Sequence, residues 1–413
     1  MLRVRQNFPK SPRLDIPATV GAEFQKVRGR IKQGARIAVG VGSRGITNLA
    51  TIVSAVLENI RTAGAEPFII PAMGSHGGAT PEGQRAILAE YGITESSMSV
   101  PILASMETRQ VGTTEDSVPV YCSTVALNAD GIILVNRVKP HTDFSGKLGS
   151  GLLKMAVIGL GKRDGATAMH GAASRLGHEA MIRKMARVMI ASAPVLGGLA
   201  ILENQFHETV RLVMLQRDEM ETGEDALLVE ARNLMPLLPF DEIDLLIVDR
   251  LGKNISGSGM DPNVTGRWVN GYSTALGREG RPAPFIRRIF VRDLTLETHG
   301  NAIGIGLADV TTTRLVRAID QRATYINGLT ALTPNCAKIP IHFDTDREAI
   351  ELVLRSLAVS DIKKIRVVRI QDTLSLVDLE VSESLLLEVK SHPSLSPVSE
   401  PSEMSFGPDG NLR

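Results

Sequence analysis

The sequence has little of what marks several classes of protein. Its two cysteines, Cys122 and Cys336, are far apart and form no CxxC motif, which excludes a disulfide framework and a thiolate zinc site. The apolar runs are too short and too often interrupted by glycine or charge to span a bilayer. Basic and acidic residues are interspersed at 46 and 45, so nothing indicates a nucleic-acid track or an affinity for acidic membranes. We therefore expect small-molecule partners, no nucleic acid and no membrane.

The first residues, MLRVRQNFPK, also lack the apolar segment of a secretory signal, so we expect a cytoplasmic protein. A length of 413 residues is too long for one compact core and favours two domains. Runs of strand length, such as ARIAVGV, EPFIIPAM, GIILVN and DLLIVDRL, alternate with stretches of helical periodicity. This alternation predicts an α/β fold of two Rossmann-like parallel-sheet domains, with the active site in the cleft between them.

The expected domain limits follow from local composition. The stretch 221–235 is predicted to be a connecting helix, and the proline-containing LMPLLPFDEI after it is the best boundary. We therefore expect an N-terminal cofactor-binding and catalytic domain over 1–238 and a C-terminal domain over 239–391 that closes the substrate site. The remaining stretch, 392–413, is rich in proline and serine, and we expect it to be disordered or loosely docked.

A glycine-rich loop follows the first of these strands. Gly40, Gly42 and Gly45 form a GxGxxG pattern between a predicted strand and a predicted helix, a context in which backbone N–H groups bind phosphate. A dinucleotide site would also require an acidic residue after the second strand, but EPFIIPAM ends in Pro, Ala and Met, which disfavours ordinary NAD binding. Arg44 within the loop suits a bidentate grip on a substrate carboxylate; the alternative is a surface arginine.

The second strand leads into a loop, MGSHGGATPEGQ, that carries His76. Doubly wound folds bind their ligands at the carboxyl ends of parallel strands, which is where this loop lies. Thr80 is expected to cap the next helix, with Pro81 at its first position. His76 is therefore a candidate site residue, and the alternative is a loop histidine bonded to backbone.

The third cluster, after GIILVN, consists of His141, Lys147, Lys154 and His170. Imidazoles serve both as acid/base groups and as metal ligands near neutral pH. The apolar surroundings of Lys154, GLLKMAVIGLG, are expected to desolvate its amine and favour a nucleophile or covalent tether; a lysine that snorkels at the sheet edge is the alternative. We treat His178, at the start of a helix, as a capping or solvated residue. The remaining histidines stand in no comparable cluster and are assigned structural or surface roles.

Two classes of protein are compatible with these residues taken alone. An NAD-linked 2-hydroxy acid oxidoreductase would use the GxGxxG loop, would bind nicotinamide and would not depend on His170. A non-catalytic module would hold a phosphorylated ligand in the glycine loops and show no turnover.

Taken together, the motifs resemble those of the nickel-dependent lactate racemase superfamily, whose members racemise or epimerise 2-hydroxy acids with a nickel-pincer nucleotide. In that family an early strand-end loop carries a carboxylate-binding arginine, similar to Arg44 in GVGSRGIT. A histidine in a G-[ST]-H pattern matches His76, and a second histidine before an F-S-G segment matches His141. The resemblance implies that these two histidines are the acid/base pair.

The same resemblance implies how a cofactor would be held. The tethering lysine matches Lys154, and the nickel-ligating histidine matches His170, sixteen residues later. The nucleotide phosphate is expected against glycine-rich backbone, with Gly42, Ser43 and Ser145 as contacts. This sequence departs from the family because KLGSGLL separates the S-G pair from Lys154, which leaves Lys147 as a second candidate tether. Synthesis of the cofactor implies biosynthetic proteins as partners.

A second departure concerns the C-terminal domain. The racemase segment that faces the substrate is replaced here by GKNISGSGMDPNVTGRW. Lys253 is expected to help bind the carboxylate, and five further residues are candidate wall residues: Asn254, Asp261, Asn263, Arg267 and Trp268. The substrate is therefore expected to be a 2-hydroxy acid whose side chain the sequence does not identify.

Overall fold

The structure is a computed structural model that describes every residue except 43–44, 143, 145, 268 and 270–283. It divides into two compact units, Ser11–Met235 and Met1–Lys10 with Pro236–Arg413. Both units contain a sheet of mainly parallel strands with helices, so the predicted α/β class with parallel sheets is confirmed.

The N-terminal unit, Ser11–Met235, is built on a five-stranded sheet in the order β3-β2-β6-β7-β8. The first four strands are parallel, and β8 returns antiparallel to β7. A separate antiparallel hairpin, β4-β5, was not predicted. The strands of this unit are β2 (Arg36–Val41), β3 (Glu66–Pro71), β4 (Thr108–Thr113), β5 (Pro119–Ser123), β6 (Gly131–Arg137), β7 (Val195–Glu203) and β8 (Thr209–Gln216).

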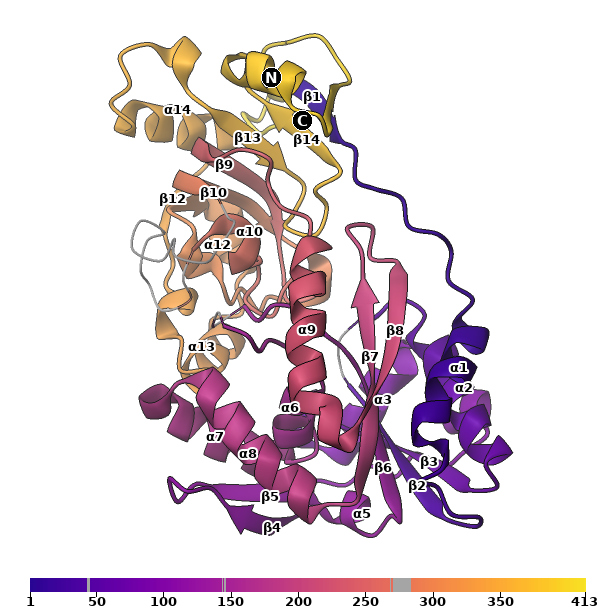
Figure 1. Ribbon diagram of the computed structural model, residues 1–413. Helices are drawn as coiled ribbons and strands as arrows, with labels where there is room; N and C mark the ends of the chain where they lie inside the picture. Colours follow the sequence, from indigo (N-terminus) through magenta and orange to yellow (C-terminus); the bar gives the residue numbers. More distant parts are fainter. Residues whose placement is uncertain (43–44, 143, 145, 268, 270–283) are drawn as a thin grey trace. The chain divides into compact units, whose positions relative to one another are not determined.

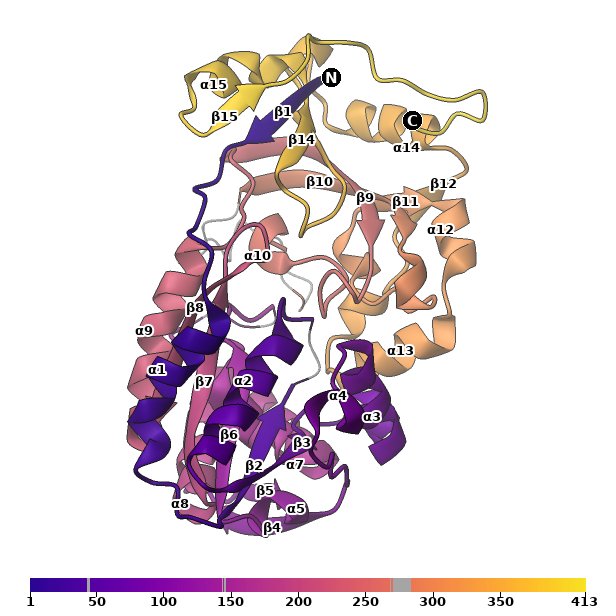
Figure 2. The same ribbon diagram turned by 90° about the vertical axis from the view of Figure 1, so that its right-hand side faces the viewer.

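Helices cover both faces of this sheet (Figure 1). Helices α1 and α2 pack on one face, as Figure 2 shows from the front, and α6 to α9 lie on the other. The helices are α1 (Ile16–Arg28), α2 (Leu49–Thr62), α3 (Pro81–Glu90), α4 (Glu95–Met98), α5 (Thr124–Leu127), α6 (Leu152–Lys154), α7 (Lys162–Leu176), α8 (His178–Ser192) and α9 (Met220–Asn233). A π-helical segment, η2 (Met155–Gly159), follows α6 directly.

Alternation along the strands explains this two-sided burial. In β2, Ile37 and Val39 belong to the apolar cluster beneath α1 and α2, whereas Ala38 belongs to the cluster beneath α6 to α9. A strand buried on both faces needs apolar residues at successive positions, which is why the sequence shows short continuous runs. Helix α3 begins at the residues predicted from the sequence. Thr80 caps it by accepting from Gly83 N at 3.1 Å, and Pro81 occupies the first turn.

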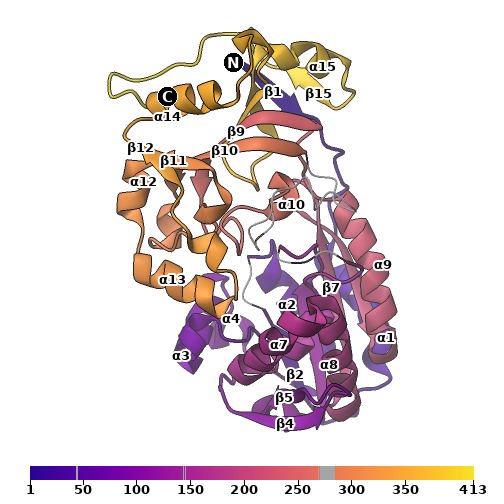
Figure 3. The same ribbon diagram turned by 90° about the vertical axis from the view of Figure 1, so that its left-hand side faces the viewer.

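The C-terminal unit has an eight-stranded sheet in the order β12-β11-β10-β9-β13-β14-β1-β15. Figure 3 labels β9 to β12 of this sheet. The first five strands in this order, β12, β11, β10, β9 and β13, are parallel to one another. The other three, β14, β1 and β15, are antiparallel to their neighbours. The strands are β1 (Leu2–Gln6), β9 (Glu242–Leu251), β10 (Phe285–Leu294), β11 (Val310–Thr312), β12 (Ile341–Phe343), β13 (Val367–Ile370), β14 (Asp378–Val381) and β15 (Leu395–Pro397). The helices are α10 (Pro262–Thr265), α12 (Thr313–Ala318), α13 (Gln321–Thr330), α14 (Asp346–Ser356) and α15 (Leu386–Ser391).

Both chain ends differ from the expectation. Residues 1–10, expected in the first domain, lie in the C-terminal unit because β1 pairs with β14 and β15 and buries Leu2 and Val4. The expectation of a disordered or loosely docked tail is wrong. The tail forms β15, and it buries Leu395 and Leu412, so it has apolar groups to pack despite its composition.

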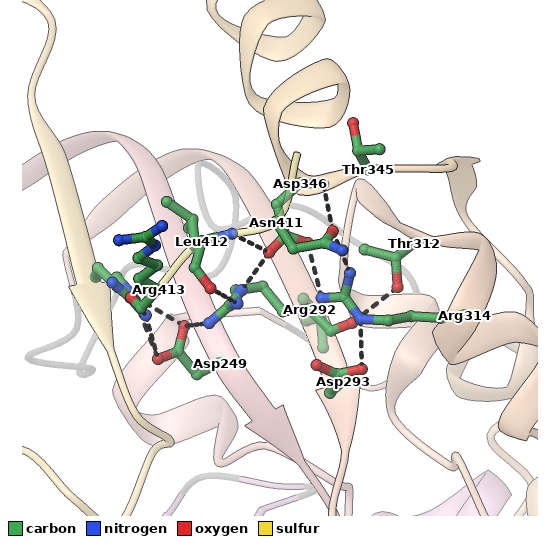
Figure 4. A network of polar contacts seen from close by, with 12 residues as sticks. Asp249, Arg292, Asp293, Thr312, Arg314, Thr345, Asp346, Asn411, Leu412 and Arg413 are labelled. Atoms are coloured by element: carbon green, nitrogen blue, oxygen red, sulfur yellow. Dashed lines mark hydrogen bonds and ion pairs between the residues drawn. The ribbon is translucent and has the colours of Figure 1, made fainter. Parts of the chain in front are cut away.

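A network of ion pairs and hydrogen bonds between side chains holds the last residues of the chain (Figure 4). The carboxylate of Asp346, which is fully buried, accepts from Arg292 Nε at 2.8 Å, from Arg314 Nη2 at 2.7 Å and from Leu412 N at 2.9 Å. Arg292 also donates to Asp249 and to the carbonyl of Leu412, each at 2.8 Å. The buried charges are therefore paired and hydrogen-bonded, which is the condition for tolerating them in a protein interior.

Candidate active site

Three strand-end loops of the N-terminal unit meet the helical segment 152–159, which consists of α6 and η2. They follow β3, β2 and β6, which are adjacent in the sheet and parallel, so their carboxyl ends lie at one edge. A Cβ placed on Gly42, after β2, would lie 3.1 Å from Met155 Cε and 3.3 Å from Asn136 Oδ1. A Cβ on Gly74, after β3, would lie 2.9 Å from Ile158 Cγ2. Both positions leave little room for a Cβ because the helical segment packs directly against them.

The turn that leads into Lys154 is held by two polar side chains. Asn136 Nδ2 donates to the carbonyl of Gly151 at 2.8 Å, and the backbone N–H of Leu153 donates to Glu224 Oε2 at 2.9 Å. Glu224 is fully buried, and within the described residues its other oxygen has no hydrogen-bond partner. Burial raises the pKa of Glu224 to about 7. Glu224 was not predicted as a site residue, because a single glutamate in an amphipathic helix gives no signal of burial.

Lys154 and His141 are in contact. The amine Nζ of Lys154 and the imidazole Nε2 of His141 lie within hydrogen-bonding distance. Lys154 is half-buried and His141 is 9 % exposed. Lys147, the second candidate tether, is exposed, and its backbone N–H donates to Glu179 Oε2 at 3.0 Å. Of the two candidates, Lys154 is therefore the one whose amine contacts a predicted acid/base residue.

A row of rings connects His141 with His170. The ring of Phe144 stacks on that of His141 with centroids 4.3 Å apart, and on that of His178 at 5.3 Å. His178 in turn meets His170 edge-on, with centroids 6.4 Å apart. The structure thus brings together the predicted tether, one predicted acid/base and the predicted metal ligand.

His178 was expected to be a capping or solvated residue, and its ring contacts two residues of the candidate site. It begins α8, after Gly177, whose φ of 85° starts a new helix and turns the chain back. That turn places the His178 ring between Phe144 and His170. The only sequence signal was its position eight residues after His170, which does not distinguish a helix cap from a site residue.

His76 stands on the neighbouring loop, where its side chain is exposed. The loop is held through its backbone. Gln84 Nε2, on α3, donates to the carbonyls of Gly74 at 2.8 Å and His76 at 3.3 Å. Gln84 Oε1 accepts at 3.0 Å from Nζ of Lys162, a lysine only 1 % exposed. Neither Gln84 nor Lys162 was singled out in the sequence.

Lys253 lies in the C-terminal unit, just after β9. Its amine donates to Asn327 Oδ1 on α13, and its backbone N–H donates to Thr298 Oγ1 at 3.2 Å. Asn301 Nδ2 also donates to Asn327 Oδ1, at 3.2 Å. Lys253 therefore belongs to a polar cluster at the carboxyl ends of β9 and β10, in keeping with the position of ligand sites in parallel sheets.

Several expected wall residues near Lys253 make local structural contacts. Asp261 caps α10 by accepting from Asn263 N at 2.9 Å. Arg267 forms an ion pair with Asp309 at 2.7 Å, and Asn254 Oδ1 accepts from Thr295 Oγ1 at 2.6 Å. These contacts give each of the residues a role in ordering the loop that follows β9.

Other predicted site residues lie outside the described part of the chain. These are Ser43, Arg44, Ser145 and Trp268. Among the described residues there is no group of three or more His, Cys, Asp or Glu side chains that could hold a metal by itself. In the same described ranges, no helix has both the length and the apolar character required to cross a membrane.

The fold and site define an α/β protein whose N-terminal unit carries a lysine–imidazole site at the carboxyl edge of a parallel sheet. Residues 23–181 match the family model of the lactate racemase N-terminal domain. They include the strand-end loops, Lys154 and His170. The chain therefore contains a lactate racemase-type N-terminal domain, and its resemblance to the lactate racemase superfamily is confirmed.

Two solved structures show the same fold. The lactate racemase apoprotein from Thermoanaerobacterium thermosaccharolyticum matches with a TM-score of 0.54 at 12 % identity, over 91 % of this chain and 99 % of that one. A protein from Thermotoga maritima matches with a TM-score of 0.52 at 13 % identity, over 87 % of this chain and 97 % of that one. No curated protein matches the sequence significantly.

Proposed function

We propose that this protein is a racemase or epimerase that inverts C2 of a 2-hydroxy acid, using a nickel-pincer nucleotide joined covalently to Lys154. The observation that carries the proposal is the contact of Lys154 with His141, continued by the row of rings to His170. The match of residues 23–181 to the lactate racemase N-terminal domain supports the same class of reaction.

The donor groups present fit such a cofactor. A half-buried primary amine can form a covalent link, and an imidazole along the same row can ligate a transition metal. One or two imidazoles leave most coordination positions to be filled, and the sulfur and carbon donors of a pincer nucleotide would fill them. When bound, this cofactor supplies a metal-activated pyridinium ring that accepts and returns the C2 hydrogen as hydride.

His141 and His76 are the proposed acid/base pair. Each would serve one enantiomer: one histidine would accept the hydroxyl proton of the bound enantiomer, and the other, already protonated, would donate a proton to the carbonyl oxygen of the planar 2-keto acid when C2 receives hydride on its opposite face. His141 is desolvated and fixed by its stack on Phe144, whereas His76 is exposed on a loop fixed through its backbone. Imidazoles suit this role because they exchange protons near neutral pH.

The substrate carboxylate is proposed to bind Arg44 and Lys253. The amine of Lys253 is oriented by Asn327, which limits the loss of rotamer freedom when a carboxylate binds. Gly42, together with Ser43 and Ser145, is proposed to contact the nucleotide through backbone groups. Proteins that build the cofactor are the partners that this proposal requires.

The test is a screen of single enantiomers of 2-hydroxy acids, in D2O, with protein co-expressed with the cofactor-building machinery. Chiral chromatography should show conversion to the opposite configuration at C2, and mass spectrometry should show that C2 keeps its hydrogen because it moves as hydride. Asn substitutions at His76 and His141 should each lower the rate by about 10² to 10⁴. Incorporation of deuterium at C2 during inversion would show that C2 is deprotonated and that no hydride is transferred. Net NAD-dependent formation of 2-keto acid would identify an oxidoreductase instead.

A further inference from the structure

A buried lysine connects the loop of His76 with the helical run that carries Lys154 and His170. Lys162 is 1 % exposed and lies in the chain midway between Lys154 and His170. Its amine donates to the carbonyl of Pro71, at the end of β3, and to Gln84 Oε1 at 3.0 Å. The contacts of Lys162 therefore lead out of its own helix and into the segment between β3 and α3.

Gln84 carries this connection to His76. The Gln84 side chain is fully buried, and its amide nitrogen donates to the carbonyls of Gly74 and His76. Lys162 and Gln84 thus bind three backbone carbonyls of the segment 71–76. The imidazole of His76 is exposed, and the backbone that carries it is held by these hydrogen bonds.

The burial and the backbone conformation of Lys162 are energetically costly. Both acceptors of Lys162 are neutral, and burial lowers the pKa of its amine to about 8. The nearby thiol of Cys122 gives no compensating charge, because burial raises its pKa to about 12. Lys162 also adopts a left-handed backbone with φ of 55°, which is unfavourable for a residue with a side chain. Strain and buried charge that persist together are typical of functional sites.

We propose that Lys162 and Gln84 are positioning residues for His76, which fix its loop against the helical run that bears the tether and the metal ligand. The role assigned to His76 rests on the proposed function, whereas the fixing of its loop does not. A second contact is consistent with this role, since Gly74 N donates to the carbonyl of Gly159 at 3.4 Å, between Lys154 and Lys162 in the chain.

The test compares Lys162→Met and Gln84→Met with the wild type, and uses Lys26→Met, a surface change on α1, as the control. Both core variants keep an unbranched side chain of similar length and remove the hydrogen-bond donors. In the apoprotein, amide hydrogen exchange in the segment 73–80 should become at least about tenfold faster, while exchange in β2 and α2 is unchanged. In ¹⁵N-histidine spectra the imidazole signals of His76 should shift or split, while those of His207 and His299 remain.

A merely structural role would change stability without moving the signals of His76. Unchanged exchange and unchanged His76 signals in folded Lys162→Met would overturn the proposal, and Gln84→Met decides it in the same way if Lys162→Met does not fold. In the loaded enzyme both variants should lower kcat with KM changed less than about twofold. If wild-type enzyme inverts no 2-hydroxy acid but the exchange effect is found, the proposed function falls and the positioning of the loop stands.

Discussion

The amine of Lys154 contacts Nε2 of His141, although the two residues come from different elements and are 13 positions apart in the chain. His141 follows β6, whereas Lys154 ends the short helix α6. Asn136 and Glu224 fix the turn between them through the backbone of Gly151 and Leu153. The contact is therefore built by the fold, and it places the amine of Lys154 next to an imidazole that can accept a proton from it.

His170 is expected to be the protein ligand to nickel. In protein loaded with cofactor, His170→Ala should retain the covalent adduct, because Lys154 is unchanged, but should lose most of its nickel. Intact-mass spectrometry and elemental analysis of the same sample measure the two quantities separately. His299→Asn, a change in the C-terminal unit, serves as the control and should keep both adduct and metal. Full nickel content in His170→Ala would mean that another residue is the ligand. His178, whose ring contacts that of His170, is then the alternative.

Two glycines of one loop provide a matched test of packing against the helical segment. Gly74 and Gly78 have nearly the same backbone, with φ of 62° and 65°. A Cβ on Gly74 would lie 2.9 Å from Ile158 Cγ2, whereas a Cβ on Gly78 would meet nothing within 4 Å. Gly78→Ala should therefore cost only the left-handed penalty of about 1 kcal/mol, and Gly74→Ala should cost about 1 to 3 kcal/mol more. Urea unfolding measures both, and equal losses would refute the close packing.

The buried carboxyl group of Glu224 predicts a pH dependence of stability. Its pKa is raised from 4.5 to about 7 in the folded protein, so between these values the folded state holds a proton that the unfolded state has released. Stability therefore falls as pH rises from about 4.5 to 7, by up to roughly 3 kcal/mol, and the loss persists above pH 7. Glu224→Gln retains an acceptor for Leu153 N and removes this loss.

The measurement is urea unfolding of wild type and Glu224→Gln at about pH 5 and pH 8. The variant should gain stability over the wild type at pH 8 and should gain much less at pH 5. A difference that is the same at both values would mean that Glu224 is ionised throughout the range.

The ion network of the C-terminal unit predicts a large loss for one aspartate and a small loss for another. Asp346→Asn leaves Arg292 and Arg314 without their shared buried carboxylate, at a cost of about 3 to 5 kcal/mol. Asp378→Asn removes an exposed pair with Arg5, and stability should be nearly unchanged. Thermal unfolding of the two variants gives the comparison, and similar melting temperatures would contradict the network's role in holding the C-terminal residues.

Much of the fold was predictable because its signals are local. The apolar runs that became β2, β3, β6 and β9 have strand length, and Thr80 with Pro81 marks the start of α3 in sequence. The place of β1 was not predictable, because pairing with β14 joins residues at opposite ends of the chain. The tail was misjudged from composition, which does not show that Leu412 is buried and its backbone N–H is bound by Asp346.

In the candidate site, too, residues with a local sequence signal were predicted and residues that depend on distant contacts were not. His76, His141, Lys154 and His170 were found because histidines and lysines among glycines are conspicuous after apolar strands. Gln84, Glu224 and Lys162 were missed, since their importance arises from burial and from contacts with distant backbone. Candidate site residues of a conspicuous type are thus easier to find in a sequence than residues whose contacts depend on the fold.

The proposed function depends above all on covalent attachment of the cofactor at Lys154, which intact mass and nickel content measure. Wild type, Lys154→Arg and Lys147→Arg would be co-expressed with cofactor-building proteins that are shown to load a known racemase. The account predicts a covalent adduct with about one nickel per chain in wild type and in Lys147→Arg, and no adduct in Lys154→Arg. An adduct that persists in Lys154→Arg, or no adduct and no nickel in any of the three proteins, would contradict it.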